Sequence, residues 1–361
     1  MIYREAGQFK TSYANDLVAF PIKQDKIGIW IWLFIAAILI PIFGLPGMDY
    51  GFAMKAIMIP VLIFTITTLG LNILTGFAGQ ISLGTGAFMG VGAYACYKLT
   101  TWFPDTNIIL LILASGFVSA FVGVIFGLPS LRIKGFYLVV ATLGAQFFLE
   151  WAFGRIGWLY NYNPSGAIEV PARDVFGVMV TGPSASPAVQ YLICLGILVL
   201  LTWIASNLIR GRIGRSWMMI RDMDIAAELI GVRPLAAKLS AFAVSSYYCG
   251  VSGALMVFIW LGAAEVESFD VNHSFLYLFM VIIGGLGSIT GSFMGAAFIW
   301  VFPLVLKEVG KGFGANATVM ENISLIAIGA MIVIILIKEP HGLARLWQIS
   351  KQKLRLWPFP H

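Results

Sequence analysis

The chain contains 361 residues, of which 59% are hydrophobic and only 11% are charged, and its formal net charge is +6. Soluble domains carry about 25% charged residues, so this composition excludes a chain built around one water-soluble core. Several apolar runs approach or exceed the ~20 residues that cross a bilayer as a helix. The ~10-residue alternating segments of a transmembrane β-barrel are not seen in the sequence. We therefore predict an all-α, polytopic membrane protein.

The cysteines and the basic residues exclude two further classes of protein. The three cysteines, Cys96, Cys194 and Cys249, all lie in apolar runs, which is typical of small core residues and not of a disulfide framework. The Lys and Arg residues cluster in loops between apolar runs, a distribution that membrane topology explains. The positive net charge therefore does not indicate nucleic-acid binding.

The apolar runs divide the sequence into three parts. Residues 1–27 are polar and predict a cytoplasmic N-terminal segment, and the first apolar run is expected to be retained because no small-residue cleavage site follows it. Residues 28–338 predict one transmembrane domain, and residues 339–361 predict a cytoplasmic basic tail. The apolar runs predict about ten transmembrane or re-entrant helices, at 28–45, 55–75, 83–99, 108–128, 136–153, 189–209, 239–262, 274–286, 289–306 and 322–338.

The charges of the loops predict the orientation of the chain. Segments 129–135 and 210–238 and the tail carry an excess of Lys and Arg, which places them in the cytoplasm by the positive-inside rule. Segment 263–273 carries three acidic residues and no Lys or Arg, which fits the opposite side. Segment 154–188, also expected outside, is rich in Pro, Gly and Ser and carries aromatic residues typical of a membrane interface, namely Trp158, Tyr160 and Tyr162.

The run 274–306 decides the number of crossings. Because segment 263–273 is expected outside and the tail inside, an odd number of crossings must separate them. If the run 274–306 crossed only once, the last helix at 322–338 would make the second crossing and end outside, against the basic tail. The run must therefore turn back, and Gly-Gly-Leu-Gly-Ser at 284–288 is the obvious place; a hairpin and a re-entrant pair both satisfy this. Ten crossings with both termini in the cytoplasm follow. The short run 274–286 rises only about 20 Å as a helix, less than the ~30 Å hydrocarbon core.

Two polar, glycine-rich breaks interrupt the apolar pattern. The first break, residues 76–86, opens the stretch GFAGQISLGTGAFMGVGAY at 76–94. The second, residues 284–292, reads GGLGSITGS. The two breaks echo each other, because Thr-Gly-Ala-Phe-Met-Gly at 85–90 resembles Thr-Gly-Ser-Phe-Met-Gly at 290–295. Polar backbone at membrane depth is tolerated only where protein buries it or where it lines a watery cavity. Interrupted helices at corresponding places indicate a transport site in many carriers, whereas close packing through small residues is the second interpretation, and the sequence leaves both open.

The breaks also predict how an anionic group would be recognised. Broken helices expose unpaired N–H groups at their N-termini, which suit carboxylates without a fixed cationic side chain. The polar side chains nearby are either substrate contacts or residues that form hydrogen bonds between helices. The candidate pathway residues are Asn72, Gly76, Gly79, Gln80, Ser82, Gly84, Thr85, Thr142, Gln146, Gly284, Gly285, Gly287 and Ser288.

Charged residues inside the apolar runs are scarce. Lys55, Lys98 and Glu150 lie near predicted helix ends and are interpreted as interfacial anchors, because long side chains extend toward the headgroups there. A buried series of Asp, Glu and His residues is not seen in the sequence. This pattern argues against a proton-coupled carrier.

Segment 210–238 reads RGRIGRSWMMIRDMDIAAELIGVRPLAAK and contains a short predicted helix. Residues 224–230 predict that helix, with Gly231 and then Pro234 as stop signals. Composition leaves two roles open for it. The helix either docks on a partner protein, where Ala226 and Ala227 allow close approach, or lies as an amphipathic helix on the lipid surface.

This segment resembles the EAA loop of ABC-importer permeases, in which two small residues precede a glycine four positions on. Ala226, Ala227 and Gly231 match that pattern, but Ile225 occupies the place of its acidic residue, and Asp224 comes one position earlier. The resemblance implies a loop that contacts an ATPase through Arg221, Asp224, Ala226, Ala227, Glu228 and Gly231.

Several further stretches resemble the LivM-type permeases of branched-chain amino acid ABC transporters. The resemblance covers roughly residues 50–345 in the right order, and the expected ten crossings are similar to those of type II importer permeases. The stretches that carry it are 70–84 with 92–94, 131–137 with 141–144, 284–291 and 340–343.

The resemblance implies a five-part importer that works by alternating access. This chain and a LivH-type second permease would form the pathway in a bacterial inner membrane, two cytoplasmic P-loop ATPases of the LivG/LivF type would drive it, and a periplasmic or lipid-tethered binding protein would deliver the solute. No cofactor is expected in this chain, because it has no GxxxxGK[ST] loop and the nearest run, 284–292, lacks the lysine. ATP and Mg would belong to the ATPases. Residues 161–170 are a candidate docking loop for the binding protein, or an unstructured connector.

The sequence leaves alternatives open for the cargo and for the class of protein. Branched-chain amino acids are the default cargo of the resembling family, while similar permeases serve urea, amides, other amino acids or aromatic acids. A stand-alone secondary carrier or channel would explain the breaks but not segment 210–238. An enzyme is not expected, because a serine nucleophile such as Ser82, Ser288 or Ser292 needs a base within reach, and His273 and His341 lie in predicted loops on opposite sides.

Overall fold

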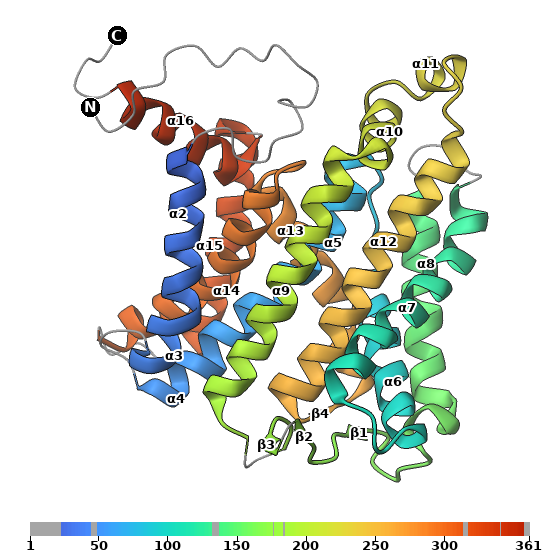
Figure 1. Ribbon diagram of the computed structural model, residues 1–361, viewed down its shortest axis with the longest axis vertical. Helices are drawn as coiled ribbons and strands as arrows, with labels where there is room; N and C mark the ends of the chain where they lie inside the picture. Colours follow the sequence, from blue (N-terminus) through green and yellow to red (C-terminus); the bar gives the residue numbers. More distant parts are fainter. Residues whose placement is uncertain are drawn as a thin grey trace.

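The computed structural model describes residues 23–44, 49–131, 137–175, 177–182, 185–312, 317–339 and 341–356. Within these ranges the chain folds into a bundle of helices with two short pairs of strands (Figure 1). Most of the predicted N-terminal segment, the loop residues Arg132 and Lys134, and Pro340 of the last matching stretch lie outside the described residues.

The elements follow the apolar pattern of the sequence, and each of the ten predicted runs coincides with a described helical stretch. The α-helices are α2 (Lys23–Phe34), α3 (Ile40–Phe43), α4 (Tyr50–Phe52), α5 (Ile59–Asn72), α6 (Thr85–Trp102), α7 (Ile108–Leu131), α8 (Tyr137–Arg155), α9 (Pro187–Arg210), α10 (Arg212–Asp222), α11 (Asp224–Leu229), α12 (Pro234–Leu255), α13 (Val271–Gly284), α14 (Ile289–Gly312), α15 (Ala317–Lys338) and α16 (Gly342–Leu356). π-Helical segments η1 (Ile35–Leu39), η2 (Ala53–Met58), η3 (Ile73–Phe77) and η5 (Met256–Leu261), and 3-10 turns η4 (Gly157–Tyr160) and η6 (Val266–Phe269), extend or connect them.

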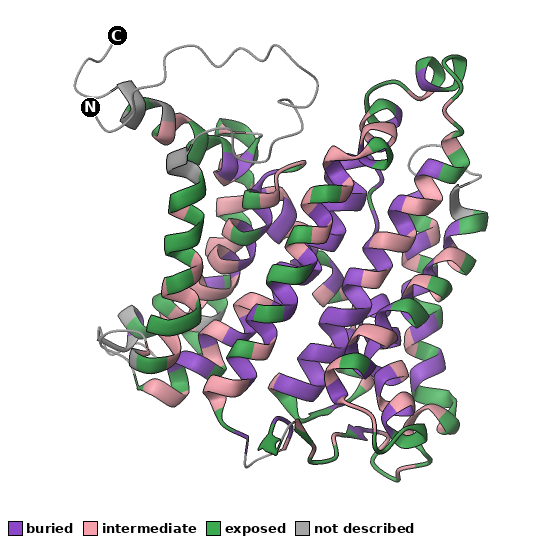
Figure 2. Cartoon of the chain, in the orientation of Figure 1, coloured by how far each residue is buried: buried purple, intermediate pink, exposed green. Residues whose placement is uncertain are grey.

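Two long helices form the centre of the bundle. They run over Tyr50–Phe77 and Pro234–Leu261, each 28 residues long and interrupted by π-helical turns, and 83% of the most apolar window of each is buried. A helix of this length rises about 42 Å, which exceeds the ~30 Å hydrocarbon core. Helices α6, α7, α9, α13 and α14 pack around these two, and Figure 2 shows the buried residues concentrated there.

Seven described helices are long and apolar enough to cross a membrane. Lys26–Ile42 forms a shorter apolar helix. Helix α6 replaces many aliphatic residues with glycine, threonine and tyrosine, and packs against α7 and α12, while α8 carries Gln146 and Glu150. These two helices meet other helices through part of their surface, which relaxes the need for an apolar side chain at every position.

The predicted reversal in the run 274–306 is confirmed. Helix α13 ends at Gly284, and α14 begins at Ile289, with Gly285 and Gly287 in the left-handed region at φ of 117° and 73°. Helix α13 has 14 residues and rises about 21 Å, so it is too short to cross the hydrocarbon core by itself.

The strands join the two predicted external segments at one end of the bundle, called here the strand end (Figure 1). β1 (Ile168–Glu169) pairs antiparallel with β4 (Ala263–Ala264), and β2 (Asp174–Val175) pairs with β3 (Val178–Met179). Segment 161–170 is therefore an ordered part of the fold and not an unstructured connector. Lys98 is buried under this segment and is not a lipid-facing anchor, because its ammonium binds Asn161 and lies 4.4 Å from the Trp158 ring centroid.

The opposite end, called here the basic end, carries α10, α11 and α16 (Figure 1). The positively charged segments 210–238 and 339–356 therefore share one end of the bundle, as their charges predicted. Helix α11 matches the predicted helix at 224–230, whereas α10 and α16 were not predicted. Both are amphipathic and basic, so a search for long apolar runs passes over them.

Candidate functional site

The first break is a mostly buried, non-helical connection between two helices, in which Gly79 and Ile81 are exposed. Helical geometry stops after Phe77 and resumes at Thr85, and Gly79 has a φ of 68°, which favours glycine. Gln80, Ser82 and Gly84 are buried in this connection. Both amide atoms of the Gln80 side chain lie buried without a hydrogen-bond partner among the described residues. A buried amide without partners is costly, so Gln80 stands out among the polar side chains of this break.

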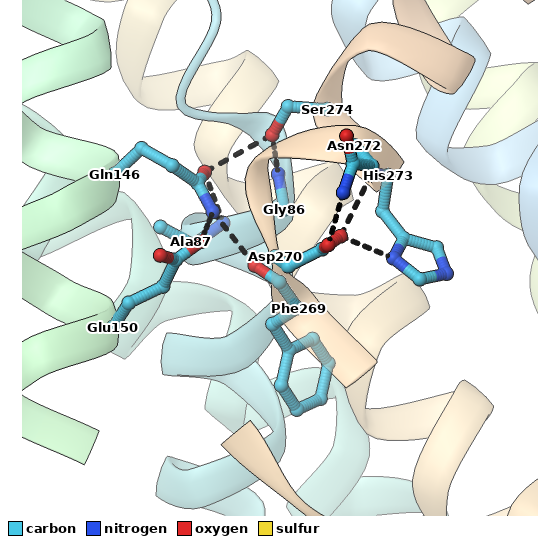
Figure 3. Close-up of polar contacts among 9 residues, drawn as sticks. All are labelled: Gly86, Ala87, Gln146, Glu150, Phe269, Asp270, Asn272, His273 and Ser274. Carbon is cyan, nitrogen blue, oxygen red and sulfur yellow. Dashed lines mark hydrogen bonds and ion pairs between the residues drawn. The ribbon is translucent and has the colours of Figure 1, made fainter. Parts of the chain in front are cut away.

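The N-terminus of α6, which follows this break, is capped by side chains from two other helices (Figure 3). The Gly86 N–H donates to Ser274 Oγ at 2.8 Å, and the Ala87 N–H donates to Gln146 Oε1 at 2.8 Å. Two residues before the helix, the Leu83 N–H donates to Thr142 Oγ1 at 3.1 Å. The donors expected to receive a carboxylate are thus occupied by protein groups in this conformation.

Gln146 on α8 joins the α6 N-terminus to the start of α13. Its Oε1 also accepts from Ser274 Oγ at 3.0 Å, and its Nε2 donates to the Phe269 carbonyl at 2.6 Å and to Glu150 Oε1 at 2.7 Å. Both ends of the amide are therefore saturated. We call this cluster of Gly86, Ala87, Gln146, Glu150 and Ser274 the polar junction.

Asp270 organises the neighbouring N-terminus of α13. Its Oδ1 accepts from the His273 N–H at 3.1 Å and lies 2.7 Å from His273 Nδ1, while its Oδ2 accepts from Asn272 Nδ2 at 2.6 Å (Figure 3). The prediction for His273 was wrong, because it is a first-turn residue of α13 and not a loop residue. Asp270 three positions before it, ahead of an apolar run, is the capping pattern that would have located this helix start.

The second break is tied to the first by Asn72 on α5. Asn72 Nδ2 donates to the Ser288 carbonyl at 2.8 Å and to Ser292 Oγ at 2.9 Å, and its Oδ1 accepts from the Gly287 N–H at 2.8 Å. At Gly76 a side chain would collide with the Gly287 backbone and with Asn72. The two breaks, more than 200 residues apart in sequence, therefore form one interlocked unit.

Close packing explains much of the echo between the breaks. Gly291 and Gly295 of α14 lie against the backbone of α13, and Gly86 of α6 lies against the Phe269 and Asp270 carbonyls at the other end of α13. Gly284 packs on Gly291 in the same way. Small residues at these positions let the helices approach, as the packing interpretation predicts.

Arg221, at the end of α10, reaches from the basic end into this unit. Its Nη1 donates to the Gly76 carbonyl at 2.9 Å, and its Nε binds Asp222 Oδ1 at 2.8 Å. A Cβ added at Gly79 would lie 2.8 Å from Arg221 Cγ, and one added at Gly287 would lie 3.5 Å from Arg221 Nη1. Arg221 thus points inward to both breaks, whereas the sequence grouped it with the residues that face a partner.

The start of α16 reaches the second break from the same end. A Cβ added at Gly285 would lie 3.1 Å from Ala344 Cβ, and Gly342 lies against the Ile283 carbonyl and the Gly285 backbone. Elements of the basic end therefore touch both breaks: α10 reaches both through Arg221, and α16 reaches the second through Gly342 and Ala344.

Helix α11 ends as the sequence predicted and presents an apolar tip. Gly231 has a φ of 92°, and the bonds from Gly231 N to Glu228 O and from Val232 N to Ala227 O, each 3.0 Å, form a Schellman motif. Ala227 is buried, while Asp224, Ala226 and Glu228 are not fully covered. The exposed fractions of the surrounding apolar residues are 84% for Leu229, 71% for Ile230, 70% for Met223 and 68% for Ile225.

The predicted site residues thus fall into three places. Asn72, Gly76, Gly79, Gly284, Gly285, Gly287 and Ser288 belong to the interlocked breaks, while Gly84, Thr85, Thr142 and Gln146 belong to the polar junction or border it. Gln80 and Ser82 lie between these two groups, and the coupling residues other than Arg221 lie on or beside α11. No group of three His, Cys, Asp or Glu side chains that would hold a metal occurs among the described residues.

A bundle with seven described helices long and apolar enough to cross a membrane is that of a multi-pass membrane protein. The family described as "Branched-chain amino acid transport system / permease component" matches residues 53–336, and the chain belongs to this family. It is 29% identical over 308 residues to the high-affinity branched-chain amino acid transport system permease protein LivM of Salmonella typhimurium, and 28% identical to LivM of Escherichia coli. Each alignment covers 78% of this chain and 68% of the relative. No solved structure matches the chain.

Proposed function

We propose that this chain is a permease subunit of an ATP-driven importer that moves branched-chain or related amino acids across the bacterial inner membrane. The observation that carries the proposal is α11, whose apolar tip is exposed on the basic end beside Gly231. Exposed apolar patches of this kind mark protein- or membrane-interaction sites, and the match of Ala226, Ala227 and Gly231 to the EAA pattern favours a protein partner. Membership of the permease family and similarity to two LivM proteins support the choice of cargo.

The coupling would run from α11 through α10 to the breaks. Helix α10 contacts α11, α12 and the end of η3, and Arg221 at its last turn binds the Gly76 carbonyl. Closure of two ATPases against α11 would displace this arginine and with it the two breaks that Asn72 holds together. A partner shifts such an equilibrium only through different affinities for the two states, so α11 must sit differently on the ATPase in each state.

The orientation follows from the charges of the two ends. The basic end, with α10, α11 and α16, would lie in the cytoplasm together with both termini, in accord with the positive-inside rule. The strand end would face a periplasmic or lipid-tethered binding protein. Pairing of β1 with β4 fixes segment 154–188 against segment 263–273 and supports a preformed docking surface there.

The remaining subunits would supply what this chain lacks. A LivH-type second permease would complete the pathway, and two P-loop ATPases of the LivG/LivF type would bind ATP and Mg, since the sequence has no phosphate-binding loop of that type. Exposed apolar side chains on α2, α7, α8 and α15 suit lipid or the second permease.

Reconstituted transport tests the proposal. The complex recovered with the full chain is placed in liposomes, and uptake of radiolabelled L-leucine, urea and phenylacetate is measured with and without ATP and the binding protein. We expect ATP-dependent uptake of L-leucine that exceeds uptake of the other two. Equal uptake without ATP would contradict an ATP-driven importer and indicate a secondary carrier. A preference for urea or phenylacetate would contradict amino acids as the cargo.

A further inference from the structure

A cavity of about 530 Å³ opens at the strand end, beside the pairing of β1 with β4. Its lining comes from α5, η5, the 263–268 segment, α13 and α14, with Ala167 just before β1. None of the breaks contributes a residue to this lining. The volume lies within the ~300–1,000 Å³ of sites for small molecules.

One wall of the cavity is aromatic and fixed in place. The ring centroids of Phe64, Trp260 and Trp300 lie 5.9, 4.8 and 5.5 Å apart in pairs, each in a tilted or edge-to-face arrangement. The indole N–H groups of Trp260 and Trp300 donate to the carbonyls of Lys55 and Ala56, both at 2.9 Å. Because the polar edges are thus paired with η2, the ring faces left for a ligand are apolar.

The other part of the lining is acidic. Glu265 and Glu267 are exposed in the cavity, His273 lies beside them, and no Lys or Arg belongs to the lining. This arrangement favours a cation over an anion. The rings of Trp260 and Trp300 add to the attraction of an ammonium group, because their faces carry negative charge density.

The inner side of the cavity borders the polar junction. His273 lines the cavity and lies 2.7 Å from Asp270, and the Phe269 carbonyl, one residue before Asp270, accepts from Gln146 (Figure 3). A ligand in the cavity is therefore separated from the α6 N-terminus only by the first turn of α13.

We propose that this cavity is a receiving site for a primary amine with an apolar chain, and in the first place for an apolar amino acid. The apolar chain packs on Phe64, Trp260 and Trp300, the ammonium faces Glu265 and Glu267, and the carboxylate stays in water at the open mouth. This inference rests on the proposed function for its choice of amino acid. It adds that recognition here depends on the amine and not on the carboxylate.

Photocrosslinking in membranes that contain the full chain tests this inference. L-Photo-leucine carries its diazirine on the side chain, so we expect adducts in the peptides that contain Trp260 or Trp300. Excess L-leucine and isoamylamine, which keep the amine, should abolish the adducts, while isovalerate, which keeps only the carboxylate, should leave them unchanged. Replacement of both acids, Glu265→Gln with Glu267→Gln, should raise the isoamylamine concentration needed for half-displacement about fivefold or more.

Two matched controls lie at the same end of the bundle but outside the cavity. Trp102→Ala removes an exposed tryptophan that packs on Trp158, and Glu169→Gln removes an exposed carboxylate of β1. Both variants should crosslink as the wild type does. Adducts elsewhere in the chain, or displacement by isovalerate as readily as by isoamylamine, would overturn the inference.

Uptake measurements separate this inference from the proposed function. Suppose that the wild type imports L-leucine with ATP, and that the variant with both Glu265→Gln and Glu267→Gln reaches half-maximal uptake at the same L-leucine concentration. The cavity then does not receive the substrate, and the importer proposal stands. If the wild type does not import L-leucine, the importer proposal fails, and the amine-dependent crosslink alone decides whether the cavity binds such ligands.

Discussion

Arg221 is the residue through which the basic end should control the breaks, and its removal gives a quantitative prediction. Arg221→Ala removes the bond from Nη1 to the Gly76 carbonyl and the packing of the side chain on Gly79. A hydrogen bond from a charged donor contributes about 1.5–3 kcal/mol. If the bond forms in only one of the two transport states, its loss changes their ratio by about tenfold to about 150-fold.

The assay compares ATP hydrolysed with L-leucine transported in liposomes that contain the complete complex. Arg221→Ala should leave ATP hydrolysis running while uptake falls by about tenfold or more, because the ATPases still close but no longer move the breaks. Arg221→Lys should restore part of the uptake, since a lysine keeps the charge but lacks the planar fork that binds two groups at once.

Asp222→Asn is the matched control for Arg221. It removes the partner of Arg221 Nε but leaves the bond to Gly76, and the pair is solvent-exposed, so it contributes only about 0–1 kcal/mol. The ratio of ATP to L-leucine should therefore remain at its wild-type value. A wild-type ratio and rate in Arg221→Ala, in a complex that assembles normally, would refute the role of this arginine.

Four further substitutions test the breaks. Gly79→Val should abolish uptake without loss of assembly, because a side chain there costs about 1–2 kcal/mol in backbone strain and meets Arg221 Cγ, and Gly84→Val should do the same through contact with the Thr142 carbonyl; normal uptake in either would contradict this. Gln80→Met should leave thermal stability equal or higher, since it removes an unpartnered buried amide, yet lower uptake; a large fall in melting temperature would indicate a purely structural residue. Asn72→Leu should lower stability by about 2–4 kcal/mol through three lost bonds, measured by thermal unfolding. The control is Thr67→Val, which loses the contacts of one hydroxyl with Ser252 Oγ and Met89 Sδ on two other helices and should lower stability less.

The long apolar helices were predictable because each depends on a local apolar pattern, unlike the amphipathic α10 and α16. The run 289–306 predicted the start of α14 at the observed residue, and the stop signals at Gly231 and Pro234 predicted the end of α11. Composition also predicted that 210–238 and the tail would share one end. These features follow from periodicity, caps and charge, which a single segment displays by itself.

The contacts within the site were not predictable, because they join segments far apart in the chain. Gln146 meets Ser274 across 128 residues, and Asn72 meets Gly287 across 215 residues. A sequence shows that such polar side chains are present but not which of them saturate one another. For the same reason the α6 N-terminus was expected to be open to a carboxylate, whereas Gln146 and Ser274 occupy it.

Arg221 was misassigned because its neighbours set its expected role. It follows the basic helix α10 and precedes α11, so its sequence context is that of a solvent-facing charge. Only the fold shows that α10 lies against η3, which brings the guanidinium within reach of the Gly76 carbonyl in the last turn of η3. Such carbonyls attract cations.

Affinity purification of the full chain from its native host in mild detergent tests the central claim most directly. The wild type is compared with Leu229→Asp combined with Ile230→Asp on the tip of α11, and with Leu346→Asp, an exposed apolar residue of α16 at the same end. We predict that the wild type and the α16 variant recover a second permease and a P-loop ATPase, and that the α11 variant recovers the permease alone. A chain that purifies alone in every case, or an ATPase retained by the α11 variant, would contradict the account.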